Sequence, residues 1–224
     1  AISGLLTFIM FIMSFRYWKT KRKITLLSGM TVFFMVFQAW LGATVVFSVL
    51  QPIKITIHML MALVILALMV YLISKVPDPS KEKNIIFDKR LYQFLKIAIV
   101  LSLIQITLGT QVRQLIDEIA SSLYHMQRNL WVDLVGTTFK VHRSFAISLV
   151  IINVTLFFRN YKLKYRYQLV NYIVVIVFLE VLSGIILTYF DMLALMQPIH
   201  LILASLLFLI QIALYFKLQK VKSM

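Results

Sequence analysis

Apolar runs about twenty residues long recur along the whole of this 224-residue chain. A helix needs about 20 apolar residues to cross the roughly 30 Å hydrocarbon core of a bilayer. Hydrophobic residues make up 61% of the chain and charged residues only 14%, whereas soluble domains are roughly half apolar. The sequence therefore predicts an all-α polytopic membrane protein that lies in a lipid bilayer.

The hydrophobic pattern predicts seven spans, of which the first is partial. A fourteen-residue helix is only about 21 Å long, too short to cross, and the chain begins with Ala1. We therefore expect residues 1–14 to be the remainder of a helix whose outer half is absent, so that the parent protein has eight spans. The predicted spans are residues 1–14, 24–50, 55–74, 91–111, 140–158, 167–189 and 200–216.

The formal charge of +15 is explained by topology, and we expect no nucleic-acid partner. Alternate loops and the C-terminal tail hold 17 of the 23 Lys and Arg residues. Basic loops stay in the cytoplasm, so we expect a cytoplasmic C-terminus and an external polar loop at 112–139. The chain has no cysteine, which excludes disulfides and thiolate metal sites. The basic segments are 16–23, 75–90, 159–166 and the residues after 216.

Two helical hairpins with the same layout recur 142 positions apart. Each contains an apolar helix with a polar residue and a glycine four positions later, then a Gln-Pro loop, then an apolar helix with a histidine in its first turns. Such a duplication predicts two pseudo-symmetric four-helix bundles related by a parallel repeat. The equivalent residues are Gln38, Gly42 and His58 in the first copy, and Glu180, Gly184 and His200 in the second.

The repeat and the loops together predict three regions. Residues 1–74 are the remainder of an N-terminal four-helix half, residues 75–90 a cytoplasmic connector, and residues 91–224 a C-terminal four-helix half.

Three histidines are expected at a similar depth near the outer membrane face: His58, His142 and His200. Each could be a hydrogen-bonding group in the core, but ionisable residues in membrane helices usually face the bundle interior and have a function. Imidazole is a common metal ligand, and two imidazoles from facing helices can hold a haem iron. We predict His142 and His200 as an axial pair, with His58 as a further iron ligand, and His125 as an exposed loop residue.

Other polar residues have both a structural and a functional interpretation. Glu180 is the only carboxylate deep in a predicted span; it is protonated, bonded to a neighbouring helix, or catalytic. Arg113 and Arg143 lie at outer helix ends, where they either pair with haem propionates or anchor the helices at the interface. The glycines four residues after Gln38, Gln105 and Glu180 allow close helix packing or make room for a macrocycle.

Five segments in order resemble the heme A synthase family, most closely its version in bacteria of the Bacteroidetes type. The resemblance implies eight helices in two halves, haem b held by His142 and His200, and haem O as the substrate near His58. A second histidine and a glutamate of that substrate site would precede Ala1. The segments are FQAWLGATVV (37–46), KITIHMLMALVI (54–65), QITLGTQVRQ (105–114), VHRSFA (141–146) and QPIHLILASLLF (197–208).

The resemblance also implies a reaction, a location and partners. The reaction is oxidation of a methyl group of haem O to a formyl group, which gives haem A. The location is the bacterial inner membrane, and the partners are haem O synthase and cytochrome oxidase assembly factors. The residues alone leave two other readings open: a di-haem b electron-transfer cytochrome without substrate chemistry, and a transporter built from parallel repeats.

Overall fold

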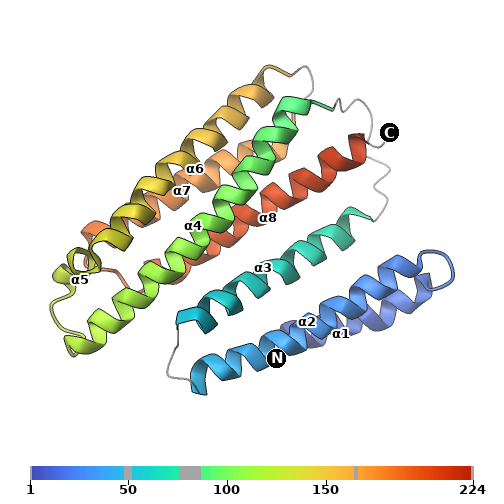
Figure 1. Ribbon diagram of the computed structural model, residues 1–224. Helices are drawn as coiled ribbons and strands as arrows, with labels where there is room; N and C mark the ends of the chain where they lie inside the picture. The colour runs from blue at the N-terminus through green and yellow to red at the C-terminus, as the bar shows by residue number, and fades with distance from the viewer. Residues whose placement is uncertain (1, 48–51, 76–86, 164–165, 223–224) are drawn as a thin grey trace. The chain divides into compact units, whose positions relative to one another are not determined.

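The computed structural model describes residues 2–47, 52–75, 87–163 and 166–222, and throughout these ranges the regular structure is helical (Figure 1). The chain divides into two compact units, Ala1–Pro79 and Ser80–Met224. The predicted all-α fold is confirmed. Most of the predicted connector, residues 76–86, and Gln51 of the first Gln-Pro loop lie outside the described residues.

The first unit contains α1 (Ile2–Ser14), the short 3-10 helix η1 (Phe15–Tyr17), α2 (Arg22–Phe47) and α3 (Pro52–Ser74). Helix α2 packs against both α1 and α3. Gly29 allows α1 and α2 to approach closely, because a Cβ atom there would lie 3.0 Å from Cε2 of Phe11. The buried Thr25 hydroxyl donates to the carbonyl of Ser14 at 2.7 Å and fixes the turn between these helices.

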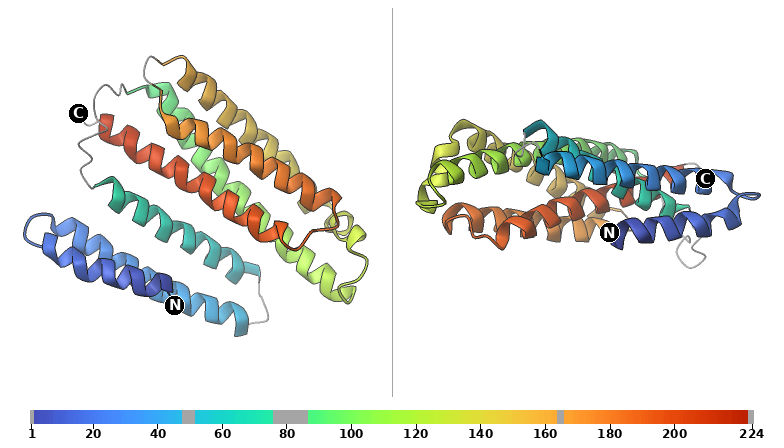
Figure 2. Two further views of the ribbon diagram at one scale, coloured as in Figure 1. Left: turned by 180° about the vertical axis from the view of Figure 1, so that it is seen from behind. Right: turned by 90° about the horizontal axis from the view of Figure 1, so that it is seen from below.

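The second unit contains α4 (Lys89–Ser122), α5 (Arg128–Val135), α6 (Thr137–Tyr161), α7 (Gln168–Tyr189) and α8 (Met196–Lys222). Among the long helices, α4 packs on α6, α6 on α7, α7 on α8, and α8 on α4. The two opposite views of the ribbon show this ring of neighbours (Figures 1 and 2). Helices α6 and α8 therefore occupy opposite corners of the bundle and run in the same direction.

A chain of buried polar side chains crosses the core of this second unit. The Ser102 hydroxyl donates to Oε1 of Gln211 at 2.8 Å, and Nε2 of Gln211 donates to Oδ1 of Asn153 at 3.1 Å. The Asn153 amide in turn donates to the carbonyl of Leu149. These bonds join α4, α8 and α6 inside an apolar core that includes Leu156 and Leu214. Every link in this buried chain has a partner, as a low-dielectric interior requires.

The end of the bundle at the start of α4 and the end of α6 is held by an ion pair and a helix cap. Asp88 accepts from the backbone N–H of Leu91, which caps α4, and pairs with Arg159 in the last turn of α6. The Arg159 guanidinium holds the pKa of Asp88 below its ordinary value of 3.8. Burial, and next the charge of Asp88, raise the pKa of Tyr167 to about 12. The Asn160 side chain donates to the backbone carbonyl of Tyr167 and accepts from its backbone N–H. These two bonds close the turn between α6 and α7.

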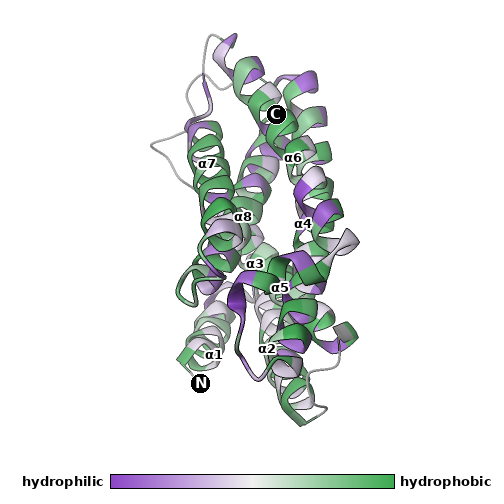
Figure 3. Cartoon of the chain, turned by 90° about the vertical axis from the view of Figure 1, so that its left-hand side faces the viewer, coloured by the Kyte–Doolittle hydropathy of each residue, from purple (hydrophilic) through white to green (hydrophobic). Residues whose placement is uncertain are grey.

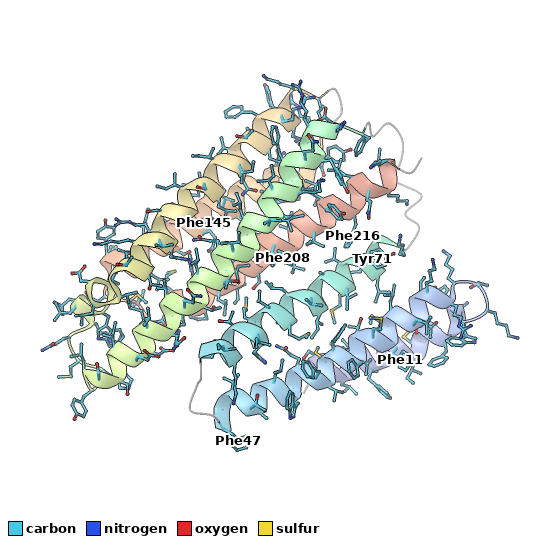
Figure 4. All side chains as sticks on the ribbon, in the orientation of Figure 1. Phe11, Phe47, Tyr71, Phe145, Phe208 and Phe216 are labelled. Atoms are coloured by element: carbon cyan, nitrogen blue, oxygen red, sulfur yellow. The ribbon has the colours of Figure 1, made fainter. Side chains whose placement is uncertain are left out.

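Membrane-spanning character is found in six of the described helices, α2, α3, α4, α6, α7 and α8, and a shorter apolar helix covers Ile2–Tyr17. Hydrophobic residues cover most of the helix surfaces, with hydrophilic ones mainly toward the helix ends (Figure 3). Large apolar side chains project outward along the helices of both units (Figure 4); Phe47, for example, is 85% exposed. Such extensive apolar exposure suits a lipid environment.

The predicted loop at 112–139 is wrong for most of its length, because α4 continues to Ser122 and α5 follows. The extended part of α4 is amphipathic. Ile116 and Ala120 pack with Trp131 and Val135 of α5 in a small second core. On the opposite face, side chains four residues apart bond each other, Arg113 with Asp117 and Gln114 with Glu118. Hydropathy alone missed this helix because its polar face interrupts the apolar run.

Candidate functional site

The structure brings His142 and His200 into one bundle, at the same end. His142 lies in the first two turns of α6, and His200 lies in the first two turns of α8. Because these helices are parallel and diagonally opposed, the two imidazoles enter the bundle from opposite corners. Two imidazoles on different helices of one bundle are a donor set that can hold a haem iron.

Each predicted glycine lies against the imidazole of a histidine on a neighbouring helix. A Cβ atom at Gly109 would lie 3.4 Å from Cε1 of His142, and one at Gly184 would lie 3.6 Å from Cε1 of His200. In the first unit, the same distance from Gly42 to His58 is 3.2 Å. The glycines therefore make room for the edge of an imidazole ring.

Three helix pairs, which we call the histidine hairpins, each bring a glycine against a histidine: α2 with α3, α4 with α6, and α7 with α8. In two of them, the glutamine four residues before the glycine holds the histidine. Gln105 Nε2 donates to the carbonyl of His142 at 3.2 Å and lies 3.4 Å from its ring Nε2. Gln38 does the same to His58, at 3.0 and 3.2 Å. Residues four apart share one face of a helix, so the glutamine and the glycine contact the same imidazole.

The third hairpin contacts its histidine through a different atom. His200 Nδ1 lies 2.9 Å from Oε2 of Glu180 and 2.7 Å from Oγ of Ser183. The Ser183 hydroxyl also donates to the backbone carbonyl of Glu180 at 2.9 Å. Of the alternatives predicted for Glu180, the structure shows the bond to a neighbouring helix.

Ser183 was not among the predicted site residues, although the sequence carries a signal for it. Aligned on their glycines, the three segments read QAWLG (38–42), QITLG (105–109) and EVLSG (180–184). Two of them have leucine immediately before the glycine, and only the third has serine, together with the exchange of glutamine for glutamate. A polar residue where its counterparts are apolar could have identified Ser183.

Buried polar atoms around His142 fit a further ligand. Among the described residues, the buried Nδ1 of His142 and Oε1 of Gln105 have no hydrogen-bond partner. The 3.4 Å contact between Gln105 and Nε2 of His142 is longer than an ordinary N–H···N bond, so this nitrogen is readily released to a metal. Together with Nε2 of His200, the donor set is two imidazoles on opposite helices, which suits an iron porphyrin ligated on both faces.

The predicted basic residues lie near this end of the bundle, in exposed positions. Arg113 bonds Asp117 at 2.9 Å and also contacts the side chain of Gln197 at the start of α8. The Arg143 guanidinium lies 5.7 Å from the centre of the Phe139 ring. His125 is exposed, with a positive φ of 60° in the turn after α4. In the first unit, His58 of α3 lies against Gln38 and Gly42 of α2.

Comparison with known protein families gives one assignment. The model of the COX15-CtaA family, described as cytochrome oxidase assembly protein, matches residues 1–212. A search of individual curated proteins found no match. The family match covers both units and includes all three histidine hairpins. The chain therefore belongs to the COX15-CtaA family of cytochrome oxidase assembly proteins.

Proposed function

We propose that this chain is a heme A synthase, an oxidoreductase of the membrane that converts haem O to haem A. The reaction oxidises a ring methyl group of haem O to a formyl group by successive hydroxylations, a four-electron oxidation that requires dioxygen or an external electron acceptor as the oxidant. The observation that carries the proposal is the diagonal pair His142 and His200 within a chain that matches the COX15-CtaA family over residues 1–212.

In this proposal the two units have different roles. In the second unit, His142 and His200 would hold the iron of haem b. When bound, haem b would supply a one-electron carrier. The glycines at 109 and 184 keep space for the two imidazoles, and the surrounding apolar core excludes water. The first unit contributes His58 as an iron ligand for the substrate haem O.

The positively charged side chains at this end give the propionates a place to bind. Among the described residues, no carboxylate pairs with Arg143, so its guanidinium is the better propionate partner. Arg113 already bonds Asp117 and would exchange that bond for a propionate. Bound in this way, the apolar porphyrin would lie within the membrane, with its propionates near these arginines.

We further propose that the protein resides in the bacterial inner membrane with its C-terminus in the cytoplasm, as the distribution of basic residues favours. Haem O synthase, which would supply the substrate, and the assembly factors of cytochrome oxidase, which would receive haem A, are the expected partners.

The test uses the full-length protein and two readouts. Purified protein should show the absorption spectrum of a six-coordinate haem b, and His142→Ala or His200→Ala should abolish it. Cells that lack the protein should accumulate haem O and lose haem A. Retention of the haem b spectrum in both alanine variants would falsify the ligand assignment. Unchanged haem A in the deletion strain would favour a di-haem electron-transfer cytochrome instead.

A further inference from the structure

We propose that Glu180 and Ser183 are positioning residues that fix the tautomer of His200 and lower the reduction potential of the haem it ligates. This inference rests on the proposed function, because it needs a haem on His200. It also distinguishes the two proposed ligands: a carboxylate contacts His200, whereas an amide contacts His142.

The hydrogen bonds around His200 determine which ring nitrogen carries the proton. The Ser183 hydroxyl donates to the backbone carbonyl of Glu180 at 2.9 Å or to Oε2 of Glu180 at 3.4 Å. With either acceptor, Oγ faces Nδ1 of His200 with a lone pair. An ionised carboxylate can only accept. Both neighbours of Nδ1, at 2.7 and 2.9 Å, therefore require an N–H there. Nε2 is left with its lone pair and becomes the iron ligand.

The geometry also keeps this arrangement rigid. Glu180, Ser183 and Gly184 lie at positions i, i+3 and i+4 of α7, so all three share the face turned to α8. The Glu180 side chain is only 14% exposed and the His200 side chain 28%. Because this contact is largely removed from solvent, its electrostatic effect is weakly screened.

The other two hairpins show that the carboxylate is a specific feature and not a requirement of helix packing. Gln38 and Gln105 stand at the position of Glu180, and Leu41 and Leu108 stand at the position of Ser183. Both glutamines bond the backbone carbonyl of their histidine, and both leave the histidine Nδ1 without a partner among the described residues. The same hairpin thus forms without Glu180 or Ser183.

A carboxylate on Nδ1–H strengthens the imidazole as a ligand, as second-shell carboxylates do at other metal sites. The added electron donation favours ferric over ferrous iron, so it lowers the reduction potential of the bound haem. In this proposal Glu180 acts through His200, as a positioning residue.

The first experiment is a redox titration of purified holoprotein that compares the wild type with Glu180→Gln. Glutamine preserves the shape and can still accept from Nδ1–H, but it removes the charge, so the haem should stay bound. If the carboxylate favours ferric haem by about tenfold, the midpoint potential should rise by about 59 mV. Glu118→Gln is the matched control: it removes a carboxylate at an exposed position of α4 and should leave the potential unchanged.

The second experiment separates the bond from any effect of Glu180 on folding or haem retention. His200→Gly opens a space that free imidazole can fill, which restores the six-coordinate spectrum. Adding Glu180→Gln to His200→Gly should weaken imidazole binding by about 10- to 100-fold, the range seen when second-shell partners are lost. His200→Gly combined with Glu118→Gln should bind imidazole as tightly as His200→Gly alone.

The outcomes distinguish this inference from the proposed function. If wild-type protein binds haem through His142 and His200, but Glu180→Gln changes neither the potential nor the imidazole affinity, only this inference is overturned. If the haem spectrum survives both His142→Ala and His200→Ala, the proposed ligand pair fails and this inference fails with it. A raised potential together with weaker imidazole binding supports both.

Discussion

At the residue scale, the distance between a glycine and its imidazole differs among the three hairpins. A Cβ atom would lie 3.2 Å from Cε1 of His58 at Gly42, 3.4 Å from His142 at Gly109, and 3.6 Å from His200 at Gly184. The last distance is an ordinary van der Waals contact, and the first requires the ring to move. Of the three positions, Gly42 is therefore the one where a side chain is least tolerated.

We predict that Gly42→Ala destabilises the protein more than Gly184→Ala does. At Gly42 the methyl group overpacks the site against the His58 ring, which costs about 1–3 kcal/mol and is only partly offset by the helix propensity of alanine, about 1 kcal/mol. At Gly184 the methyl group fits and the propensity gain remains. Chemical denaturation of both variants in detergent measures the order. Equal stability of the two variants would contradict this reading of the contacts.

At the scale of helices, the second unit is held in register by bonds that link different helices. The buried chain from Ser102 through Gln211 to Asn153 joins three helices, and it lies about three turns of α8 beyond His200. Asp88 and Arg159 join α4 and α6 at the far end. These links are directional, whereas apolar contacts in lipid are not, so they fix the rotation of each helix and with it the direction of the histidines.

Gln211, the central residue of this hydrogen-bonded chain, gives a testable prediction. Gln211→Ala leaves the Ser102 hydroxyl and the Asn153 carbonyl oxygen without their partner in a buried site, which should cost about 1–3 kcal/mol of unfolding free energy. Gln219→Ala, on an exposed position of the same helix, is the matched control and should change stability by no more than about 0.5 kcal/mol. Denaturant titration of both variants measures the difference in unfolding free energy. If only Gln219→Ala lowers that free energy, the hydrogen bonds of Gln211 do not stabilise the bundle.

At the scale of the whole molecule, alternation of basic and less basic segments predicts the orientation in the membrane. The helical segment after residue 111 should be external, and the basic turn at 16–23 should be cytoplasmic. Helix α4 extends past the expected end of its span, and its amphipathic end packs on α5. This second small core lies at the same end of the second unit as His142.

Orientation can be measured directly because the chain has no cysteine. Single cysteines replace exposed residues, one in the external part of α4 (Ser121→Cys) and one in the basic turn (Thr20→Cys). A membrane-impermeant maleimide applied to spheroplasts should label Ser121→Cys and leave Thr20→Cys unlabelled. After permeabilisation both should react, which shows that each thiol is accessible. Labelling of Thr20→Cys in sealed spheroplasts would reverse the proposed orientation.

The sequence by itself determined the helical membrane class, the positions of the long spans and the recurrence of the polar residue, glycine and histidine. These are properties of hydropathy and spacing, which depend only on neighbours along the chain. It failed at the polar end of α4, because an amphipathic helix that packs on α5 has no continuous apolar run. It also failed to single out Ser183, whose importance comes from a histidine seventeen residues away.

Tertiary structure decided which side chains meet. It placed α6 and α8 at opposite corners, so that His142 and His200 share one bundle, and it gave His200 a carboxylate where His142 has an amide. Spacing along a helix defines a face, but the partner of that face depends on how each helix is rotated and packed against its neighbours. That choice depends on contacts such as Ser102 with Gln211, which join residues far apart in the chain.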